Sequence, residues 1–279
     1  MKYFFISDLH VDFYTPSTQN ESTLQKSFEA IFERNFLPAD ACCIAGDIAN
    51  DSFTYIKFLQ FINEKYSKVY VCLGNHDIIT EFSSIYGDHI FATSESKIDF
   101  IFAEVTKLKN IHLLENSISE GIAGCLGMCD FKYKHSPNAS ETLNKMLWAT
   151  RWFDGRHWNY MKNNTVHLWK YYDKVFWNLS KQRPKIMMSH FLPLEIGMPE
   201  RYRNDPCSNF FYFHGAPYLE NLDEGCIWQA GHTHIAIKRK YTDSKGKQHL
   251  LLCNPVGYPD ENPYAEYGLN KSDFLLEIL

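Results

Sequence analysis

KVYVCLGNHD, residues 68–77, joins an apolar run to three polar side chains across a glycine. The β-branched and aromatic residues of its first half are typical of a buried strand. Gly74 permits a backbone path that would aim Asn75, His76 and Asp77 into a cleft. Gly-Asn is also a common loop dipeptide, so taken alone the stretch is better explained as an ordinary turn. The other strands of the chain decide between these two interpretations.

Four other apolar runs also end on Asp or His at the point where a strand should stop. They are KYFFISDLH (2–10), ADACCIAGD (39–47), KIMMSH (185–190) and CIWQAGHTH (226–234). In open α/β sheets, ligands bind beyond the carboxyl ends of the strands, so five such ends would converge on one site. A site built of Asp, Asn and His side chains has the composition of a metal site.

Apolar periodicity between these strands predicts helices. Residues 22–35, 53–66 and about 96–108 each repeat apolar side chains at the spacing that buries one face of a helix. Strands and helices thus alternate, which indicates a layered α/β fold. We expect the 279 residues to form a single domain, 1–279.

The regular alternation changes in the middle of the chain. Residues 118–131 are interpreted as a glycine-interrupted strand, and an aromatic segment at about 132–182 holds five of the six tryptophans. We interpret this segment as an insertion with helices at 151–158 and 166–179. The insertion could either pack against the rest of the fold or form a wall of the substrate cleft, and the sequence leaves both alternatives open. The other expected elements are a short helix near 219–222, a hairpin of strands at 237–241 and 249–253, and a last strand at 274–278.

Composition narrows the class of protein. A net charge of −5 provides no general field that would attract nucleic-acid backbone or anionic lipid. The eight cysteines include no Cys-x-x-Cys pair, and we expect them to be reduced and buried. No apolar run approaches the ~20 residues of a membrane span, and the first residues lack a signal-peptide core. These features predict a cytoplasmic protein.

The five strand ends resemble, in their order, the motifs of the calcineurin-like metallophosphoesterase superfamily. The matching residues are Asp8 and His10 (Asp-x-His), Gly46-Asp47, Gly74 to Asp77 (Gly-Asn-His-Asp), His190, and Gly231 to His234 (Gly-His-Thr-His). The resemblance extends from residue 2 to about residue 260 and leaves the insertion unmatched. It implies an α/β/β/α sandwich, in which helices flank two central mixed sheets and a dinuclear metal site lies at the carboxyl ends of the strands.

The resemblance also implies the metal ligands. One ion would be held by Asp8, His10, Asp47 and His234, and the other by Asp47, Asn75, His190 and His232. Asp47 would bridge the two ions, and a shared carboxylate offsets the repulsion between cations ~4 Å apart. Imidazoles combined with oxygen donors favour Mn, Fe, Zn or Ni over Mg, and the choice among these metals stays open.

In such a site a metal-bridging hydroxide attacks phosphorus in line, so the expected activity is hydrolysis of a phosphodiester or a phosphomonoester. Asp47 and His76 are the expected catalytic residues. By the same resemblance, His76 would protonate the leaving oxygen, and a purely structural imidazole is the alternative. The expected partner is a small-molecule or nucleotide phosphoester.

One departure from the resemblance concerns Asn50. The protein phosphatase branch has an aspartate three residues after the bridging aspartate and then an arginine, whereas this chain has Asn50 and Asp51. Asn50 can accept a hydrogen bond from His76 but supplies no charge. The missing arginine argues against a protein Ser/Thr phosphatase and favours a bacterial-type phosphodiesterase or small-molecule phosphatase.

Candidate substrate contacts follow His190 in a loop that should rim the cleft. They are Arg201, Arg203, Asn209 and Tyr212, for which a solvated loop is the alternative. A nuclease on the same chemistry would need a basic channel with interleaved aromatic residues, and the acidic balance argues against it. A catalytically silent scaffold would have broken ligand positions, and none is broken here. The substrate and the oligomeric state stay open.

Overall fold

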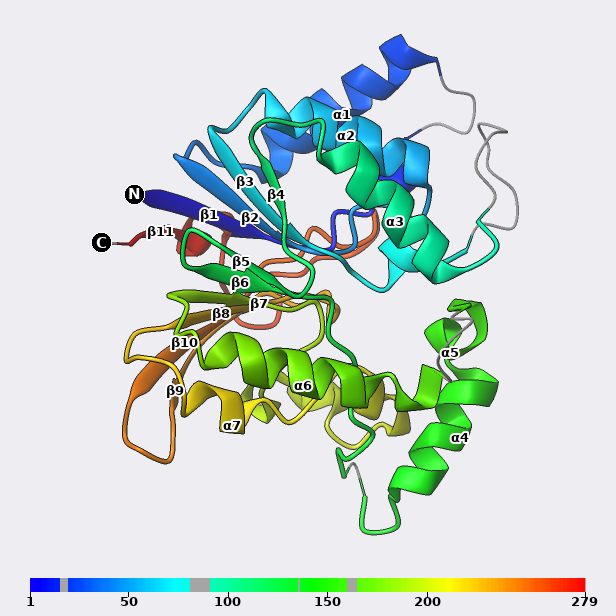
Figure 1. The fold of residues 1–279 in the computed structure, drawn as a ribbon, viewed down its shortest axis with the longest axis vertical. Helices are drawn as coiled ribbons and strands as arrows, with labels where there is room; N and C mark the ends of the chain where they lie inside the picture. Colours follow the sequence, from blue (N-terminus) through cyan, green and yellow to red (C-terminus); the bar gives the residue numbers. More distant parts are fainter. Residues whose placement is uncertain (16–19, 81–90, 135, 160–164, 279) are drawn as a thin grey trace.

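Two β-sheets pack face to face at the centre of the protein, and helices cover their outer faces (Figure 1). The computed structural model describes residues 1–15, 20–80, 91–134, 136–159 and 165–278. The two ends of the described chain lie together, because the last strand pairs with the first. The expected α/β/β/α sandwich with two mixed sheets is confirmed.

The first sheet has the strand order β11-β1-β2-β3-β4. Its strands are β1 (Lys2–Ile6), β2 (Ala41–Ala45), β3 (Lys68–Cys72), β4 (Ile111–Leu113) and β11 (Leu275–Glu277). β1 to β4 run parallel, and β11 runs antiparallel beside β1. Every residue of the central strand β2 is buried, as expected for a strand covered on both faces. The carboxyl ends of β1, β2 and β3 therefore lie at the same side of the sheet.

The second sheet has the strand order β5-β6-β7-β8-β10-β9. Its strands are β5 (Ser117–Ser119), β6 (Ile122–Gly124), β7 (Ile186–Met188), β8 (Ile227–Ala230), β9 (Ile237–Thr242) and β10 (Gln248–Cys253). β6, β7, β8 and β10 run parallel, and the edge strands β5 and β9 are antiparallel to their neighbours. The expected hairpin is confirmed as β9 and β10.

Helices form the outer layers and one end of the sandwich. The α-helices are α1 (Glu21–Asn35), α2 (Ser52–Asn63), α3 (Ser94–Val105), α4 (Glu141–Arg151), α5 (Phe153–His157), α6 (Trp169–Ser180) and α7 (Ala216–Leu219). The 3₁₀ helices are η1 (Val11–Tyr14), η2 (His76–Ile78), η3 (Thr165–His167), η4 (Glu195–Gly197), η5 (Glu200–Tyr202), η6 (Pro206–Phe210) and η7 (Lys271–Phe274). α1 to α3 cover the first sheet, α6 and α7 cover the second, and α4 and α5 lie at one end (Figure 1). Of the apolar stripe predicted in α1, Leu24, Phe28 and Ile31 are buried, and Phe32 is partly buried.

Two expectations in the middle of the chain are wrong. The single strand expected at 118–131 is instead the antiparallel pair β5 and β6, which turns at Glu120 and Gly121 and ends at Gly124. Gly127, with a φ of 78°, is in a left-handed conformation that does not continue a strand. The helix expected at 151–158 is divided at Trp152, whose extended backbone (φ −76°, ψ 142°) ends α4 and precedes α5. α4 itself was not expected. Residues 135 and 160–164 of the expected insertion lie outside the described residues.

Seven of the eight cysteines are buried as expected, and Cys207 is exposed. In the part of the chain that the structure describes, no helix has both the length and the apolar character needed to span a membrane.

Gln229 of β8 ties the second sheet to the first. Its side chain is fully buried, and its Nε2 donates to the carbonyl oxygens of Ile6 and Cys43, at 2.8 and 3.0 Å. A buried amide with two such partners holds the ends of β1 and β2 against β8. The strand ends of both sheets consequently face a common space.

Candidate metal centre

Polar side chains from five strand ends meet between the two sheets. Asp8 and His10 follow β1, Asp47 follows β2, and Asn75 with His76 follows β3. The second sheet contributes the residues that follow β7 and β8, which are His190, His232 and His234. All of these except His76 and His234 are almost completely buried. The convergence predicted from the sequence is therefore present in the fold.

The acidic and imidazole groups form two clusters that could each hold a metal ion. Asp8, His10, Asp47 and His234 form one cluster, and Asp47, His190 and His232 form the other, with ligand atoms within 4.8 Å of one another. Asp47 Oδ2 lies 3.1 Å from His190 Nε2 and 3.7 Å from His10 Nε2. The first cluster has the same residues as the first ligand group implied by the resemblance, and the second has those of the other group apart from Asn75. Asp47, the residue expected as the bridge, belongs to both clusters.

The backbone at these positions is unusual. Five of the candidate ligands have positive φ: Asp8 (51°), His10 (43°), Asp47 (55°), His232 (71°) and His234 (53°). Each such residue costs on the order of 1–3 kcal/mol and persists only where the surroundings impose it. Gly74 is one of those surroundings, because a Cβ there would lie 2.1 Å from Asp47 Oδ1. The positive φ angles of these five residues therefore reduce the stability of the fold, and they direct the side chains toward the same centre.

Asp77 does not face the centre, although the sequence placed it there with Asn75 and His76. Its Oδ1 accepts from the backbone N–H groups of Ile48 and Ala49, and its Oδ2 accepts from those of Asp47 and Gly74. Burial, and then the Asp47 carboxylate, raise its pKa to about 7. Asp77 therefore has a structural role: its hydrogen bonds hold the loop that follows β2 against the loop that follows β3.

Hydrogen bonds fix which ring nitrogen faces the centre in His190, His232 and His234. His190 Nδ1 donates to the carbonyl of Ala45 at 2.8 Å, which leaves Nε2 toward Asp47. His232 Nε2 donates to the carbonyl of Phe210 at 3.2 Å and leaves Nδ1. His234 Nδ1 lies 2.6 Å from Glu261 Oε2 and leaves Nε2. Such outer partners orient the ring and set the tautomer of histidines that bind metals.

Unpaired buried atoms test whether the residues fit metal ions. Among the described residues, Asp47 Oδ2, Asn75 Oδ1 and His190 Nε2 are buried without a hydrogen-bond partner. Buried polar atoms are normally paired, so these atoms leave room for a further ligand between them. Oxygen and imidazole donors of this kind are ligands for divalent transition metals. The arrangement fits two ions.

Burial and the central carboxylate shift the protonation of the cluster. Burial lowers the pKa of His10 and His232 well below the usual value, which favours the neutral imidazole that binds metals. For His190, burial also lowers the pKa, but Asp47 outweighs it and raises the pKa to about 9. Asp47 is correspondingly held ionised, because the opposing effect of burial on its pKa is exceeded by the nearby histidines. The Asp47 carboxylate at the centre thus stays charged.

His76 lies beside the ligands with its ring held from behind. Its Nδ1 lies 2.6 Å from Asn50 Oδ1, and Asn50 Nδ2 donates to Asp12 Oδ2 at 3.0 Å. Since a carboxylate only accepts, the amide of Asn50 must present its oxygen to His76, so Nδ1 of His76 donates. Burial lowers the pKa of His76, although Asp47 opposes this effect. The hydrogen bond that Asn50 was expected to accept from His76 is therefore present.

The four candidate substrate contacts have protein partners. Arg201 Nε lies 3.4 Å from Glu266, and Arg203 lies 3.2 Å from Glu200. Asn209 is fully buried and accepts from Asn144 Nδ2 at 2.8 Å, and Tyr212 is almost completely buried with its hydroxyl 3.1 Å from His214 Nδ1. Their role in substrate binding stays a prediction.

Several residues of the site were not identified from the sequence. Phe153 of α5 stacks on His76 with ring centres 5.7 Å apart, and Tyr258 lies against His10 with ring centres 4.5 Å apart. Asp154 accepts a hydrogen bond from Asn75. In the sequence, the only indications of these positions are the many aromatic residues of the segment 132–182 and the turn-rich composition around Tyr258. Neither feature identifies a particular residue.

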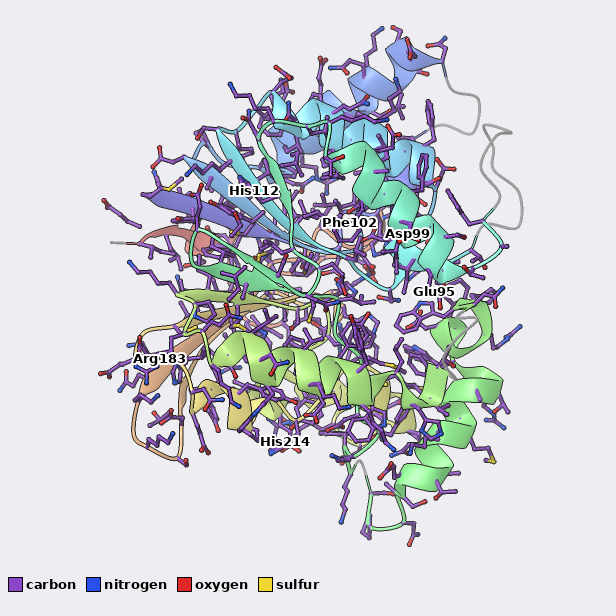
Figure 2. All side chains as sticks on the ribbon, viewed as in Figure 1. Glu95, Asp99, Phe102, His112, Arg183 and His214 are labelled. Atoms are coloured by element: carbon purple, nitrogen blue, oxygen red, sulfur yellow. The ribbon has the colours of Figure 1, made fainter. Side chains whose placement is uncertain are left out.

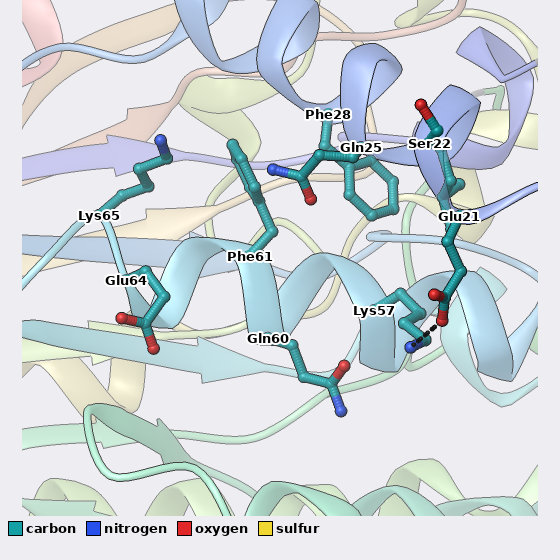
Figure 3. Close-up of a pocket in the computed structure, with 10 residues that line it drawn as sticks. Glu21, Ser22, Gln25, Phe28, Lys57, Gln60, Phe61, Glu64 and Lys65 are labelled. Carbon is teal, nitrogen blue, oxygen red and sulfur yellow. Dashed lines mark hydrogen bonds and ion pairs between the residues drawn. The ribbon is translucent and has the colours of Figure 1, made fainter.

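Other histidines and grooves lie apart from the centre. Figure 2 shows His112 on β4 and His214 on the side of the second sheet; His112 bonds Ser119 and stacks on Tyr70. A groove of about 560 Å³ lies between α1 and α2, where Glu21 pairs with Lys57 at 3.1 Å (Figure 3). Among the described residues, the clusters that could hold a metal ion both lie between the sheets and not in this groove.

Comparison with known proteins agrees with this geometry. The model of a family described as calcineurin-like phosphoesterase matches residues 1–236. No curated protein was found to match the sequence. Phosphopantetheinyl hydrolase from Mycobacterium tuberculosis is a similar solved structure, with a TM-score of 0.70, 15% identity, and coverage of 100% of this chain and 95% of that chain. A dimetal phosphatase from Danio rerio has a TM-score of 0.41 and 12% identity, with 94% and 89% of the two chains covered.

Proposed function

The chain belongs to the calcineurin-like phosphoesterase family and is a phosphate-ester hydrolase, and we propose that it hydrolyses a small phosphodiester with two bound transition-metal ions. The observation that carries this proposal is the pair of ligand clusters sharing Asp47. Asp8, His10 and His234 would hold one ion with Asp47, and Asn75, His190 and His232 would hold the other. When bound, such ions polarise phosphoryl oxygens and lower the pKa of a bound water.

His76 supports the proposal as a proton donor. Its Nδ1 is engaged by Asn50, so Nε2 is the ring nitrogen left for a substrate. The backbone N–H of His76 donates to Asp47 Oδ1 at 2.9 Å, which fixes the ring next to the bridging carboxylate. Because Nδ1 already holds a proton, Nε2 carries one only in the imidazolium form, which burial disfavours and the Asp47 carboxylate favours. Transfer of that proton to the oxygen that leaves phosphorus returns the ring to its neutral form, an effect typically of ~10²–10⁴-fold.

The surroundings of the centre favour a diester over a monoester. A phosphomonoester carries up to two negative charges, whereas a diester carries one and has a second organic group. Arg201 and Arg203, the cations expected to bind phosphate, are each paired with a glutamate. Phe13 and Phe153 instead place exposed rings, 48% and 47% accessible, beside His10 and His76. Exposed rings at this position suit a flat or apolar ester group.

A substrate panel tests the proposed function. Purified protein is stripped with a chelator and reloaded with Mn, Zn, Mg or Ni, and the hydrolysis of a bis-aryl phosphodiester is compared with that of the corresponding monoester. A phosphopantetheinyl diester is included, because the mycobacterial hydrolase of similar fold is named for that group. We expect the higher kcat/KM for diesters and close to two ions per chain by elemental analysis.

Two results would contradict the proposal. A folded chain that binds no transition metal after incubation with Mn or Zn would exclude the two-metal mechanism. A higher kcat/KM for the monoester would exclude the diester preference. Oligonucleotides in the same panel test the nuclease alternative, which predicts faster cleavage of single-stranded DNA or RNA than of the aryl diester.

A further inference from the structure

Asn75 differs from the other candidate ligands because its side-chain amide can point either of two different atoms at the centre. Its amide has an oxygen, which can bind a metal ion, and a nitrogen, which cannot. The two ends have nearly the same shape, so only the hydrogen bonds of the amide decide which end faces the centre. In the structure Asn75 Oδ1 is buried without a partner among the described residues, and Nδ2 donates to Asp154 Oδ1 at 2.8 Å.

Asp154 can enforce this orientation. Its side chain is 1% exposed, and as a carboxylate it accepts hydrogen bonds but does not donate them. An Asn75 amide turned the other way would place its carbonyl against that carboxylate, an acceptor facing an acceptor. The turned amide would also aim its N–H groups at the space where a cation would lie. Both changes are unfavourable where the two side chains are buried.

Asp154 is itself held in place by its neighbours in the chain. Trp152 Nε1 donates to Asp154 Oδ2 at 2.9 Å, so each carboxylate oxygen has its own donor. Trp158 Nε1 donates to the backbone oxygen of Asn75 at 3.1 Å, and its ring is almost completely buried. Gly155 lets α5 approach α4, because a Cβ at this position would lie 2.1 Å from the carbonyl of Trp148. The short segment 152–158 therefore holds both the side chain and the backbone of Asn75.

We propose that Asp154 is a positioning residue of the metal centre: it orients the Asn75 amide so that Oδ1 faces the ion shared with Asp47, His190 and His232. The inference rests on the proposed function, since it presumes that this cluster holds an ion. It also gives the aromatic segment a role at the centre that neither simple packing nor a lid provides. Outer partners of this kind typically change metal affinity by about 10–100-fold when they are removed.

Metal binding, rather than turnover, is the decisive measurement. The metal-free full chain is titrated with Co²⁺ or Mn²⁺, and ion affinities are obtained by calorimetry and by the visible absorption of Co²⁺. Asp154→Asn is expected to weaken one of the two ions by about 10–100-fold and to leave the other within a few-fold of the unmodified chain. Trp152→Phe, which removes one donor to Asp154 and keeps a ring, is expected to have a smaller effect in the same direction.

A paired exchange separates positioning from simple structural support. In the variant that combines Asn75→Asp with Asp154→Asn, the donor and the acceptor change places, and an oxygen can still face the ion. We expect this variant to recover most of the affinity lost in Asp154→Asn. Thermal unfolding of each metal-free variant is measured alongside, so that a folding defect is recognised before the ion affinities are compared.

The possible failures of the inference and of the proposed function are distinct. If the unmodified chain binds no ion, the proposed function fails. If it binds two ions and Asp154→Asn binds both with unchanged affinity, only the role of Asp154 fails. The role also fails if Asp154→Asn loses an ion and the paired exchange, folded to the same thermal stability, does not recover it.

Discussion

Asp47 and His76 are adjacent in the centre but are attached to it in different ways. Asp47 belongs to both ligand clusters, whereas His76 is held by Asn50 and by a backbone bond to Asp47. We therefore expect Asp47→Asn to lower metal occupancy and abolish turnover. His76→Ala should keep both ions and lower kcat by ~10²–10⁴-fold. Elemental analysis and steady-state kinetics of the two variants check these expectations.

The leaving group provides the control for His76. An alkyl alkoxide needs a proton as it leaves, whereas nitrophenolate departs without one. The loss in His76→Ala should be larger for an alkyl ester than for a nitrophenyl ester. Equal losses on both substrates would remove His76 from the role of acid and leave it as a structural imidazole.

Sequence reasoning at the scale of single residues reached the candidate ligands but not the groups that orient them. Each of the seven ligands stands just after a strand, so a local pattern marks it. Asp154 is separated from Asn75 by 79 positions, and Glu261 is separated from His234 by 27. A contact between segments that are distant in the sequence produces no local pattern of residues, so it could not be predicted from the sequence. Asp77 shows the opposite error, because a polar residue inside a motif was assigned to the cleft and is bonded to backbone amides.

At the scale of elements, regular alternation was predictable and the segment from β6 to β7 was not. The helices before this segment each show one apolar stripe, as in α1. Just beyond Gly124, Cys125 and Leu126 still bond to Met188 and His190, and the left-handed Gly127 then ends the extended path. The composition of the segment does not mark this end. The division between α4 and α5 falls at Trp152, whose ring packs on the distant Phe210 and Phe211, at 4.8 and 5.4 Å between ring centres. Propensity alone does not contain this information.

α5 leads to a prediction about substrate choice. Phe153 stacks on His76 and on His157, at 5.7 and 4.1 Å between ring centres, and its side chain remains 47% exposed. Phe153→Ala should raise KM for an aryl diester several-fold and change KM for a dialkyl diester little, because only a flat group loses a stacking partner. Steady-state kinetics on both substrates and elemental analysis of the variant decide this. Phe13→Ala is the matched comparison on the other exposed ring. Loss of metal in Phe153→Ala, or equal changes in KM on both substrates, would contradict a role in substrate stacking.

At the scale of the whole molecule, the two sheets share one centre. The first sheet supplies Asp8, His10, Asp47 and Asn75, and the second supplies His190, His232 and His234. The sheets are also joined directly by the hydrogen bonds of Gln229 on β8 to the backbone of β1 and β2. An ion with ligands on both sheets opposes their separation, so metal binding should stabilise the entire sandwich and not only its loops. The resemblance predicted the two-sheet arrangement, but the direct link through Gln229 was not apparent from the sequence.

Removal of metal tests this coupling between the sheets. An ion that binds only the folded state at a free concentration 100-fold above its Kd adds about 2.7 kcal/mol to the free energy of unfolding. For a chain of this length that corresponds to a rise in Tm of roughly 5 °C or more. We expect a chelator to lower Tm by at least this amount and Mn or Zn to restore it. Asp8→Ala, on the first sheet, and His232→Ala, on the second, should each remove much of the restoration, since either change breaks a bridge between the sheets. Calorimetric scans at matched free-metal concentration measure the shift. If metal leaves and returns while Tm stays constant, the ions bind a framework that is already fully held by its core, and the sheets are not coupled through the centre.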